Sequence, residues 1–532
     1  MRKYLFVTGG VVSSLGKGLT MASVAMLLEK KGIRLAMLKL DPYLNIDPGT
    51  MNPFEHGEVY VTDDGAETDL DLGHYYRYTH SPLSRASIAT SGQIYDTVIK
   101  KERHGDYLGK TVQVIPHITD EIKRRIAHCG EVADAELVLV EIGGTVGDIE
   151  SLPFLEAIRQ FRHERPHNCL NIHMTYVPYL KAAGEVKTKP TQHSIQTLRG
   201  IGIIPDLIIC RCEQPLSREI KDKIGLFANL SPQAIFEAID VKHSIYEVPL
   251  TLHRDGIDAR ICKELCLPNS VIDLSAWQEL VKTVISPKGT LTIGIVGKYL
   301  QHQDAYKSIF EALEHGALAA GYSLNIRAIE SDKEEMIHEL SGCDGCLVPG
   351  GFGERGWEGK IAAARYCREH NLPYFGICLG MQVLAVEFAR HVMGHIHANS
   401  TEMDPHTKMP VISLLSEMLH REDLGGTMRL GAYQCLLQEG SKAHAAYGTS
   451  SISERHRHRY EFNNRFKQEA EGAGLVFSGM SQDGSLCEIA EIRHHPWMVG
   501  VQFHPEFKSR PTQPHPLFRD FIAAAAKAKS HD

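Results

Sequence analysis

The sequence predicts an α/β protein made of two doubly wound domains, each built on a parallel sheet. Two stretches carry this prediction. Residues 4–8, YLFVT, form a short apolar run that enters glycines and then a helical pattern closing at Gly32. Residues 291–297, LTIGIVG, do the same before a helical pattern at 304–321 that closes at Gly321. Alternation of apolar strands with helices is typical of parallel sheets covered on both faces.

The length of the chain also favours two domains. The chain has 532 residues, whereas single hydrophobic cores seldom grow beyond about 250–300 residues. The segment SPKGT at 286–290 has a linker-like composition. We therefore predict a first domain over 1–267, a linker over 268–289 and a second domain over 290–532, which ends in a helix.

Composition narrows the classes of protein to which the chain can belong. Hydrophobic residues make up 43% and charged residues 23%, as in ordinary soluble globular proteins. A formal net charge of -8 gives no general attraction to nucleic acid or to an anionic membrane. The sequence contains no run of about 18 apolar residues, and its first apolar stretch is too short for a signal peptide. The 12 cysteines lack a disulfide or zinc spacing, so we expect a cytoplasmic protein without nucleic-acid or membrane partners.

A glycine-rich loop, VTGGVVSSLGKGLT at 7–20, lies between the first apolar run and the first helical pattern. This is the context of a phosphate-binding loop, in which backbone N–H groups and a lysine, here Lys17, surround phosphate oxygens. The spacing departs from the usual motif: five residues separate Gly10 from Gly16, and Gly18 stands where a Ser or Thr normally ligates Mg²⁺. A plain turn of small residues is the alternative. The loop predicts a phosphate site whose metal ligands lie elsewhere.

Two acidic segments supply candidate metal ligands. Residues 63–75 form an acid-rich loop, and residues 137–150 form an apolar strand that ends in Glu141 and a glycine turn. Mg²⁺ favours one or two carboxylates together with phosphate oxygens and water. A carboxylate at the carboxyl end of a parallel strand faces the crevice where α/β folds bind ligands. We therefore predict Glu141 and Asp71 as ligands, with a solvated acidic loop as the alternative for 63–75.

A basic segment, GEVKTKPTQHS at 184–194, alternates lysine with threonine and contains a stiffening proline. Such a loop suits a polyanion such as a triphosphate. Considered alone, the segment is more simply interpreted as solvated surface.

A cysteine lies at a predicted strand–turn–helix junction, LPYFGICLGMQVLAVEFA at 372–389. Gly376 and Gly380 flank Cys378 and permit the strained elbow that exposes a nucleophile. At that point the positive end of the helix favours the reactive thiolate. A buried structural cysteine is the alternative.

A second apolar strand ends in HPE, so that His504 and Glu506 follow one another at an interval of two residues. Glu506 could hold the imidazole of His504 while that ring takes the proton of Cys378. The glycine turn VPGGFG at 348–353 could form an oxyanion hole together with the N–H of Leu379. These features together predict a Cys–His–Glu catalytic triad.

These motifs resemble two known families. GICLGMQ at 376–382 with HPE at 504–506 resembles the triad glutamine amidotransferases, which release ammonia from glutamine. Six long segments resemble the CTP synthase family, at 7–18, 39–53, 56–75, 105–119, 141–160 and 184–194. The resemblance extends from residue 4 to about residue 520. It implies an N-terminal phosphate-loop synthetase domain of the dethiobiotin-synthetase type and a C-terminal triad glutamine amidotransferase domain.

The resemblance also implies the nucleotide sites. UTP would contact the glycine loop, the basic segment and a later helix, at Ser13, Lys187, Thr188, Lys189, Pro190, Thr191, Gln192 and Lys223. The product CTP would overlap this set and add Asp148, Ile149 and Glu150. ATP would contact Ser14, Leu15, Gly16, Lys17, Gly18, Leu19, Asp71, Ile239, Asp240 and Val241. Mg²⁺ would be held by Asp71 and Glu141.

Glutamine, by the same resemblance, would contact Gly351, Leu379, Gly380, Met381, Gln382, Glu402 and Arg459. Arg459 lies in ERHRHRYEFNN at 454–464, which alone would be interpreted as a basic surface run.

A phosphate site joined to an ammonia source indicates activation of a poor leaving group and its displacement. As the family works, ATP phosphorylates the 4-oxygen of UTP, and ammonia released by Cys378, His504 and Glu506 displaces phosphate to give CTP. Ammonia must travel unprotonated, since ammonium is no nucleophile, so a sheltered passage is implied. The resemblance further implies GTP as an allosteric activator, CTP as a feedback inhibitor and a homotetramer.

Two other interpretations remain at this stage. One is another phosphate-loop amidoligase with a glutaminase domain, of the cobyrinic acid amidating type, which lacks segments like 187–194 and 69–75. The other is a non-catalytic filament or scaffold protein, which the intact triad and Lys17 disfavour. The chain departs from the CTP synthase family in a short stretch between 410–418 and 423–431, where many relatives have a longer loop. That departure bears on regulatory contacts and leaves the chemistry unchanged.

Overall fold

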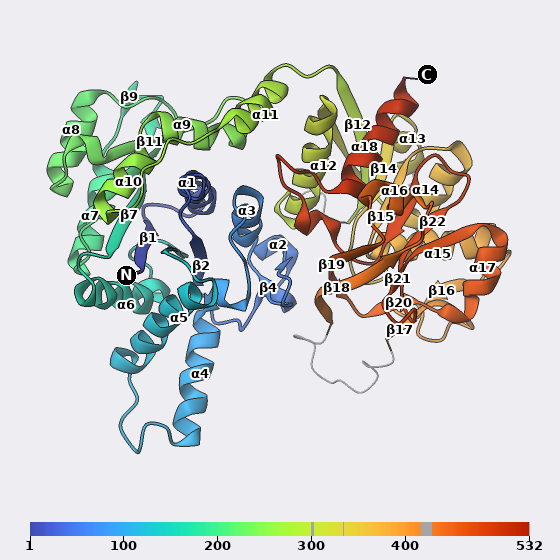
Figure 1. Cartoon of the computed structure of the whole chain (residues 1–532), viewed down its shortest axis with the longest axis horizontal. Helices are drawn as coiled ribbons and strands as arrows, with labels where there is room; N and C mark the ends of the chain where they lie inside the picture. The colour runs from blue at the N-terminus through green and yellow to red at the C-terminus, as the bar shows by residue number, and fades with distance from the viewer. Residues whose placement is uncertain (299–302, 334, 416–427, 531–532) are drawn as a thin grey trace. The chain divides into compact units, whose positions relative to one another are not determined.

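The computed structural model describes residues 1–298, 303–333, 335–415 and 428–530. The chain divides into two compact units (Figure 1). The first contains Met1–Asp47 and Asp71–Val281, and the second contains Pro48–Leu70 and Lys282–Asp532. The second boundary falls inside the segment 268–289, where α11 (Ser275–Ile285) forms. The sequence patterns did not indicate that 48–70 would pack with the second unit.

The first unit is built on a parallel sheet. Among the described residues its seven strands have the order β11-β10-β7-β1-β6-β2-β5, and every neighbouring pair is parallel. The strands are β1 (Lys3–Gly9), β2 (Leu35–Asp41), β5 (Ile88–Thr90), β6 (Leu137–Ile142), β7 (Cys169–Tyr176), β10 (Leu207–Cys212) and β11 (Ile235–Ile239). The predicted first strand is β1 at the centre. Its near-continuous apolar sequence fits a strand buried on both faces.

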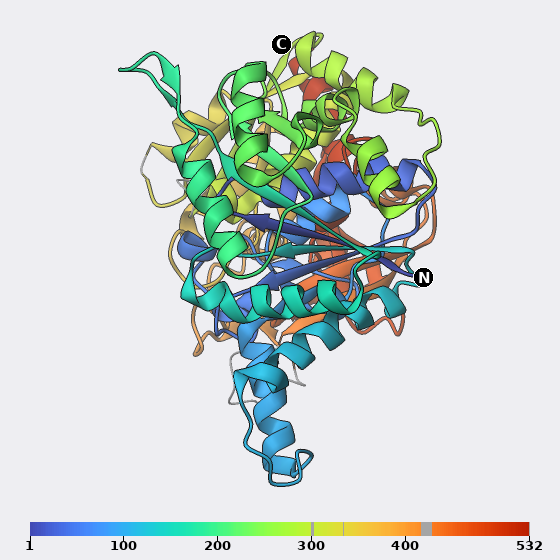
Figure 2. The ribbon, with the colours of Figure 1, turned by 90° about the vertical axis from the view of Figure 1, so that its left-hand side faces the viewer.

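Helices cover both faces of this sheet. They are α1 (Lys17–Lys30), α3 (Asp71–Tyr78), α4 (Ser91–His104), α5 (Thr119–Val132), α6 (Leu152–Glu164), α7 (Lys189–Gly200), α8 (Arg218–Ala228), α9 (Val248–Arg254) and α10 (Ile257–Leu265). Helix α1 packs with α3, α9 and α10, and α5 packs with α6 on the opposite face (Figure 2). Figure 2 also shows α4 and the loop after it projecting away from the sheet. A small hairpin, β8 (Tyr179–Leu180) and β9 (Glu185–Val186), precedes α7.

The second unit has a mixed sheet. Within the described part of the chain its order is β13-β12-β14-β15-β23-β22-β21-β18-β19. The strands are β12 (Thr290–Gly297), β13 (Ser323–Glu330), β14 (Gly345–Val348), β15 (Tyr374–Ile377), β18 (Arg429–Leu437), β19 (Ser451–His458), β21 (Leu475–Ser481), β22 (Cys487–Ile492) and β23 (Met498–Val501). Strands β13 to β23 in that order are parallel, and the remainder continue antiparallel. The predicted parallel α/β architecture is confirmed, and the antiparallel extension is an addition that the sequence patterns did not predict.

Helices of the second unit are α12 (Lys307–Ala320), α13 (Met336–Ser341), α14 (Trp357–His370), α15 (Leu379–His391), α16 (Lys442–Tyr447), α17 (Lys467–Ala473) and α18 (Pro516–Lys529). Helix α12 packs with α18, and α14 packs with α15. A smaller sheet contains β16 (Ala398–Ser400), β17 (Met409–Leu414) and β20 (Tyr460–Phe462). The 48–70 segment carries α2 (Pro53–His56), β3 (Tyr60–Val61) and β4 (Glu67–Thr68). The predicted C-terminal helix is α18.

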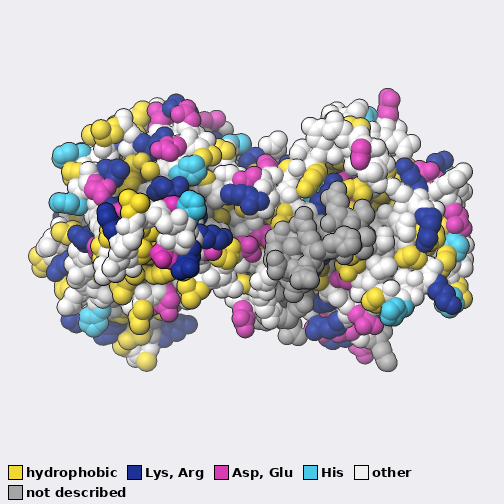
Figure 3. All heavy atoms as spheres, turned by 90° about the horizontal axis from the view of Figure 1, so that it is seen from below, with side chains coloured by type: hydrophobic (Ala, Val, Ile, Leu, Met, Phe, Trp, Pro, Cys, Tyr) yellow, Lys and Arg dark blue, Asp and Glu magenta, His cyan; other side chains and the backbone are white. Residues whose placement is uncertain are grey.

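No helix in the described ranges is both long and apolar enough to cross a bilayer. On the face shown in Figure 3, acidic and basic side chains are interspersed. The shortened stretch before Asp423 lies outside the described residues.

Candidate active sites

The loop between β1 and α1 is strongly bent. Val11, Ser14 and Gly16 have positive φ angles of 81°, 58° and 82°. Helix α1 then begins at Lys17, whose Nζ donates to the carbonyl oxygen of Gly144 at 2.8 Å. Burial lowers the pKa of the Lys17 ammonium. The loop thus joins an ammonium group to the N-terminus of a helix, the two features that bind phosphate.

The glycine at position 18 has a structural reason. A Cβ atom there would lie 2.1 Å from Oδ1 of Asp71, the first residue of α3. The carboxylate of Asp71 therefore occupies the space that a Ser or Thr side chain would need in the usual motif. The position of Asp71 therefore explains why this loop has glycine where the usual motif has Ser or Thr.

Asp71 and Glu141 meet at a lysine that the sequence analysis did not single out. Nζ of Lys39 forms ion pairs with Asp71, with Glu141 at 3.1 Å and with Asp41 at 3.7 Å. The sheet register explains this meeting, because Lys39 on β2 lies beside Glu141 on β6. Its position in the apolar run 35–40 was the available signal, which the sequence analysis did not use.

The charges of this cluster suit a divalent cation. Burial tends to raise the pKa of Asp71, but the nearby Lys39, His74 and Lys17 together outweigh it and the pKa is lowered. Burial raises the pKa of Glu141, and the Asp71 charge adds to that rise. Oxygen-only donors around a positive charge fit a hard ion such as Mg²⁺. In the described ranges no group of three or more His, Cys, Asp or Glu that could hold a metal ion is found.

A small pocket brings the predicted adenine contacts next to the phosphate loop. Ile239 and Val241 line it together with Gly16 and Leu19. The intervening Asp240 points to Arg211, with which it forms an ion pair at 2.5 Å. The structure therefore brings together loop and strand residues that lie more than two hundred positions apart in the chain.

Three segments of the predicted UTP and CTP set are neighbours. A Cβ atom at Gly10 would lie 1.5 Å from Oγ of Ser194 on α7. The Val146 N–H donates to the carbonyl oxygen of Gly9 at 2.8 Å. The glycine loop therefore touches both α7, which carries 189–192, and the turn that precedes Asp148.

The members of that set differ in exposure. Exposed members are Ser13, Asp148, Ile149, Glu150, Lys189 and Lys223. Members that are buried and bonded within the unit are Thr188, Thr191 and Gln192. Lys187 pairs with Glu185, and Pro190 is half-buried. In the described part of the chain no hydrogen bond or ion pair joins Lys223, on α8, to the other members.

Cys378 lies at a sharp turn between β15 and α15. Its φ of 51° falls in the left-handed region that side-chain-bearing residues rarely adopt. A Cβ atom at Gly376 would lie 2.5 Å from the carbonyl oxygen of Gly380. One at Gly380 would lie 2.1 Å from the carbonyl oxygen of Val348. Close packing requires both glycines, and the turn holds Cys378 at the N-terminus of α15.

His504 and Glu506 lie beside this cysteine. Nδ1 of His504 is 2.7 Å from Oε1 of Glu506. A Cβ atom at Gly350 would lie 3.0 Å from Cε1 of His504 and 3.5 Å from Cβ of Cys378. Burial would lower the pKa of His504, but Glu506 and Cys378 outweigh it and raise the pKa to about 10. A protonated imidazole near the sulfur stabilises a thiolate.

A cavity of about 190 Å³ contains all three triad side chains and Gly351 in its lining. Residues of the 48–70 segment complete the wall, among them Gly49, Met51 and Val59. A segment from the first part of the sequence therefore helps to form the pocket of the cysteine, and no sequence pattern indicated this.

The other residues predicted to bind the substrate glutamine differ in their surroundings: some form hydrogen bonds, and others are buried by packing. Glu402 accepts a hydrogen bond from the N–H of Gly353 at 2.7 Å, and Gln382 donates to the carbonyl oxygen of Tyr460 at 3.0 Å. Leu379, Gly380 and Met381 are buried at the start of α15, where they pack against neighbouring strands. Lys298, which the sequence analysis missed, donates to the carbonyl oxygens of Phe352 and Gly353 at 2.6 Å.

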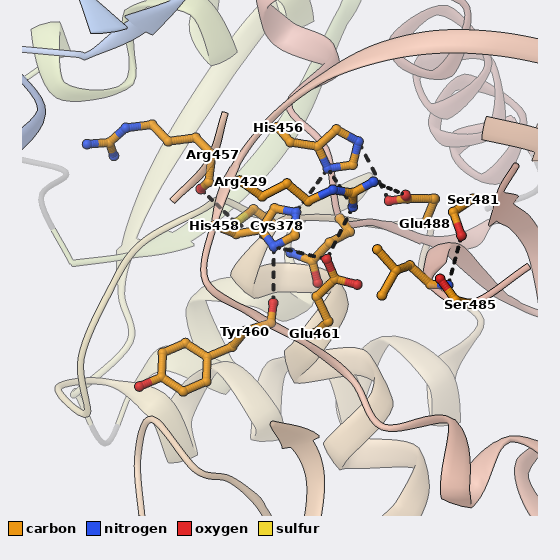
Figure 4. Close-up of polar contacts among 12 residues, drawn as sticks. Cys378, Arg429, His456, Arg457, His458, Tyr460, Glu461, Ser481, Ser485 and Glu488 are labelled. Atoms are coloured by element: carbon orange, nitrogen blue, oxygen red, sulfur yellow. Dashed lines mark hydrogen bonds and ion pairs between the residues drawn. The ribbon is translucent and has the colours of Figure 1, made fainter. Parts of the chain in front are cut away.

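The interpretation of 454–464 as a surface run is wrong. Most of it is β19 and β20, and His456 and His458 are buried. Figure 4 shows this strand passing close to Cys378, with Sγ of Cys378 3.8 Å from the carbonyl oxygen of Arg457. Alternation of Arg with His along the segment was the signal, since successive residues of a strand point to opposite faces.

Comparisons with known proteins cover both units. Residues 3–267 match the family model described as CTP synthase N-terminus, and residues 301–524 match the model of class-I glutamine amidotransferases. CTP synthase of Protochlamydia amoebophila is 70% identical over 528 residues, 98% of this chain and 97% of its own. CTP synthase of Chlamydia pneumoniae is 61% identical over 533 residues, 99% of each chain. A solved glutaminase domain of Trypanosoma brucei CTPS with bound acivicin is 38% identical over 44% of this chain and 94% of its own, with a TM-score of 0.42.

The two curated relatives match this chain along nearly its whole length, so both predicted halves are present in one polypeptide of the same kind. This does not favour an amidoligase of the cobyrinic acid type. The resemblance noted in the sequence is confirmed, and the chain belongs to the CTP synthase family.

Proposed function

We propose that the chain converts UTP to CTP, using ATP to activate the uracil ring and L-glutamine as the source of ammonia. The observation that carries this proposal is the presence, in one chain, of a lysine-bearing phosphate loop with a carboxylate cluster and of a Cys–His–Glu triad. Because the chain belongs to the CTP synthase family, we assign the first site to activation of UTP by ATP and the second to release of ammonia from glutamine.

Glutamine hydrolysis is assigned to the second unit. Glu506 orients His504, and the protonated ring stabilises the thiolate of Cys378, which attacks the side-chain amide of glutamine. Backbone N–H groups near Gly351 and Leu379 would stabilise the oxyanion. His504 then gives its proton to the leaving nitrogen, and water releases glutamate from the sulfur.

Phosphoryl transfer is assigned to the first unit. The loop Ser14–Leu19 would hold ATP, with Lys17 beside the transferred phosphate and Ile239–Val241 near the adenine. The 4-oxygen of UTP attacks the γ-phosphorus and ADP leaves. Ammonia then adds at carbon 4 and expels phosphate, which gives CTP. Asp71 and Glu141 would hold Mg²⁺, whose charge neutralises the phosphates when it is bound.

The family resemblance supports the substrate sites. Ser13, Lys187–Gln192 and Lys223 are proposed for UTP, and the exposed Asp148–Glu150 turn for the CTP that replaces it as feedback inhibitor. Gly351, Leu379–Gln382, Glu402 and Arg459 are proposed for glutamine. GTP as allosteric activator follows from the family resemblance.

A homotetramer in the cytoplasm is the proposed state. Exposed apolar side chains on the projecting α4 and the loop after it support contact with other copies. They are Ile99, Leu108, Val114 and Ile115.

The test is the change in ultraviolet absorbance as UTP becomes CTP. The purified chain is supplied with UTP, ATP, Mg²⁺ and either glutamine or ammonium chloride, with and without GTP. We expect CTP with either nitrogen source, and faster formation with GTP when glutamine is the source. Absence of CTP with both sources would overturn the proposal, and glutamate release without CTP would restrict it to a glutaminase.

A further inference from the structure

Strand β7 carries three buried polar side chains on one face. Asn171, His173 and Thr175 alternate along the strand, and each is completely buried. Because successive residues of a strand point to opposite faces, these three side chains face the same side of the sheet. Strand β7 lies inside the sheet, between β1 and β10, where parallel strands are normally apolar throughout. Buried polar groups cost free energy unless they are hydrogen-bonded, so the partners of these side chains indicate why they are polar.

The partners of two of these side chains lie on α7. Nε2 of His173 is 2.8 Å from Oγ of Ser194. Oγ1 of Thr175 donates to Oγ1 of Thr191 at 3.1 Å, and Thr191 donates to the carbonyl oxygen of Tyr176 at 2.9 Å. The first turns of α7 are therefore joined to β7 by hydrogen bonds between side chains.

These hydrogen bonds are not needed merely to keep α7 on the sheet. Ile195 and Leu198 on the same helix are completely buried, so apolar contacts already attach it. Apolar burial has no preferred direction, whereas a hydrogen bond requires a defined distance and angle. The polar contacts therefore fix where α7 lies along β7.

The imidazole of His173 also contacts the strand that leads into the phosphate loop. Its Nδ1 lies 3.0 Å from Oγ1 of Thr8, which is its neighbour in register on β1. The same oxygen of Thr8 lies 3.3 Å from the carbonyl oxygen of Ile172 and 3.4 Å from Nδ2 of Asn171. Thr8 is the last residue but one of β1, so this contact lies directly before the glycine loop.

The loop itself packs against the same two side chains. A Cβ atom at Gly10 would lie 1.5 Å from Oγ of Ser194 and 3.1 Å from Cε1 of His173. The N–H of Gly10 donates to the carbonyl oxygen of Met174 at 2.9 Å. The start of the phosphate loop, β7 and α7 thus meet at His173.

The charge state of His173 is compatible with both of its contacts. Burial, aided by the charge of Lys17, lowers the pKa of His173 to about 3, so the ring is neutral near neutral pH. A neutral imidazole has one nitrogen that donates and one that accepts. Since each ring nitrogen faces a hydroxyl group, the ring can donate to one and accept from the other in either tautomer.

We propose that His173 is a positioning residue of phosphoryl transfer, which fixes the start of α7 against the phosphate loop through Ser194 and Thr8. This inference rests on the proposed function, in which residues 187–192 hold UTP and the loop holds ATP. Reacting atoms must approach to about 3–3.5 Å in line before transfer occurs. Loss of the contact would shift one nucleotide against the other but leave the contacts that bind each of them. It should therefore lower kcat more than it raises either KM.

The experiment measures ammonia-dependent CTP formation at steady state, with UTP and ATP varied in turn. Ser194→Ala removes only the hydroxyl group. Its kcat should fall about tenfold, because a misplacement of about 1 Å can cost up to about 10²-fold, and both KM values should stay within about threefold of the wild type. His173→Leu removes both ring nitrogens and should lower kcat at least as much. The double variant should lie within about threefold of His173→Leu alone, since partners in one contact are not additive.

Thr197→Ala is the matched control on the same helix. Thr197 is exposed, and its hydroxyl donates to the carbonyl oxygen of His193 on α7 itself at 3.0 Å. This variant should keep kcat within about twofold of the wild type, as expected for a surface substitution. Basal glutamine hydrolysis should persist in every variant, and melting temperatures record any loss of stability.

A lower melting temperature with a normal kcat in Ser194→Ala would leave the contact a purely structural role and overturn the proposal. A raised KM for UTP with an unchanged kcat would place Ser194 in substrate binding and contradict it as well. If the double variant shows the product of the two single losses, the residues do not act through one contact. Should His173→Leu fail to fold, Ser194→Ala against Thr197→Ala still decides. A wild type that forms no CTP from ammonia contradicts the proposed function itself.

Discussion

The two candidate sites hold buried charge in opposite ways. In the first unit, Asp71 and Glu141 both pair with the ammonium of Lys39, with Asp41 at the edge of the group. In the second unit, His504 and Glu506 form a closed pair beside Cys378. The first site is arranged around a cation and fits phosphates and a metal ion. In the second site, the groups proposed for catalysis are all protein side chains.

This difference separates what each site needs in order to act. Glutamine hydrolysis uses a nucleophile, a base and an orienting carboxylate, and the second unit contains all three. Phosphoryl transfer depends on charges that ATP and Mg²⁺ bring with them. Changes in one site should therefore leave the basal chemistry of the other measurable, and the predictions below test that separation.

Removal of the nucleophile should give the largest effect. Cys378→Ala is expected to lower glutamine-dependent CTP formation by about 10⁴-fold or more, since the members of a triad act as a unit. Ammonia-dependent synthesis should remain near the wild-type rate. CTP formation is followed by absorbance with glutamine and with ammonium chloride in parallel. Loss of both activities in a folded variant would contradict the assignment of two separate sites.

Lys17→Ala is the counterpart in the first unit. Removing an ammonium group beside a transferred phosphate should slow synthesis about 10³-fold with either nitrogen source. Basal glutamate release at Cys378 should persist. The measurement is CTP formation from both sources together with glutaminase activity. A near-normal ammonia-dependent rate would show that phosphoryl transfer occurs elsewhere.

Glu141→Gln changes the charge of the carboxylate cluster but hardly its shape. We expect synthesis to fall about 10²-fold with both nitrogen sources, because a metal ligand beside the phosphates is lost. Basal glutamine hydrolysis should be retained, since the triad uses no metal. Coupled loss of glutaminase activity would show that the two sites are not separable in this way.

Asp71→Asn should have a smaller effect that Mg²⁺ can partly reverse. Loss of one carboxylate weakens a metal site without removing it, so half-maximal synthesis should require at least about tenfold more Mg²⁺. The test is activity against Mg²⁺ concentration for the wild type, Asp71→Asn and Glu141→Gln. If both variants titrate as the wild type does, these carboxylates do not hold the metal, and Thr20 or water becomes the candidate.

The sequence patterns predicted some parts of these sites better than others. Local sequence patterns were sufficient where the residues that form a feature lie close together in the sequence. Gly376 and Gly380 around Cys378 indicated the elbow, and a strand ending in HPE indicated the pair of His504 and Glu506. Both depend on residues within a few positions of each other.

Two features that depend on sheet register or on contacts distant in sequence, Lys39 and the 48–70 segment, were not predicted. Lys39 faces Glu141 only because β2 and β6 are neighbours in the sheet. The 48–70 segment packs in the second unit, where Glu67 pairs with Arg457 at 2.8 Å. The strand β19 was misinterpreted because charged residues usually indicate surface, whereas here partners distant in sequence neutralise them.

The smallest expected effect is on stability and concerns Lys360. This buried group of the second unit lacks a hydrogen-bond partner among the described residues, so it is an exception to the pairing of charges in that unit. The side chain lies on α14 and is completely buried, and Nζ has no hydrogen-bond partner among the described residues. Burial, aided by Lys298, lowers its pKa to about 7, and Glu402 and Cys378 oppose the shift.

The sign of its effect on stability follows from this shift. The folded pKa of about 7 lies below the ordinary lysine value of 10.5, so between these pH values the unfolded chain binds more protons than the folded chain. Stability therefore rises with pH across this window, and the cost of burying Lys360 is greatest below it. Lys360→Met should raise the free energy of unfolding by about 3 kcal/mol at pH 8, and the gain should vanish near pH 10.5. Melting temperatures of both proteins from pH 7 to 10.5 measure the difference, with Lys527→Met, at an exposed position on α18, as the matched control. A gain that is independent of pH would mean that Lys360 is charged and paired in the folded chain, and the second unit would then lack any unpaired buried amine in its described residues.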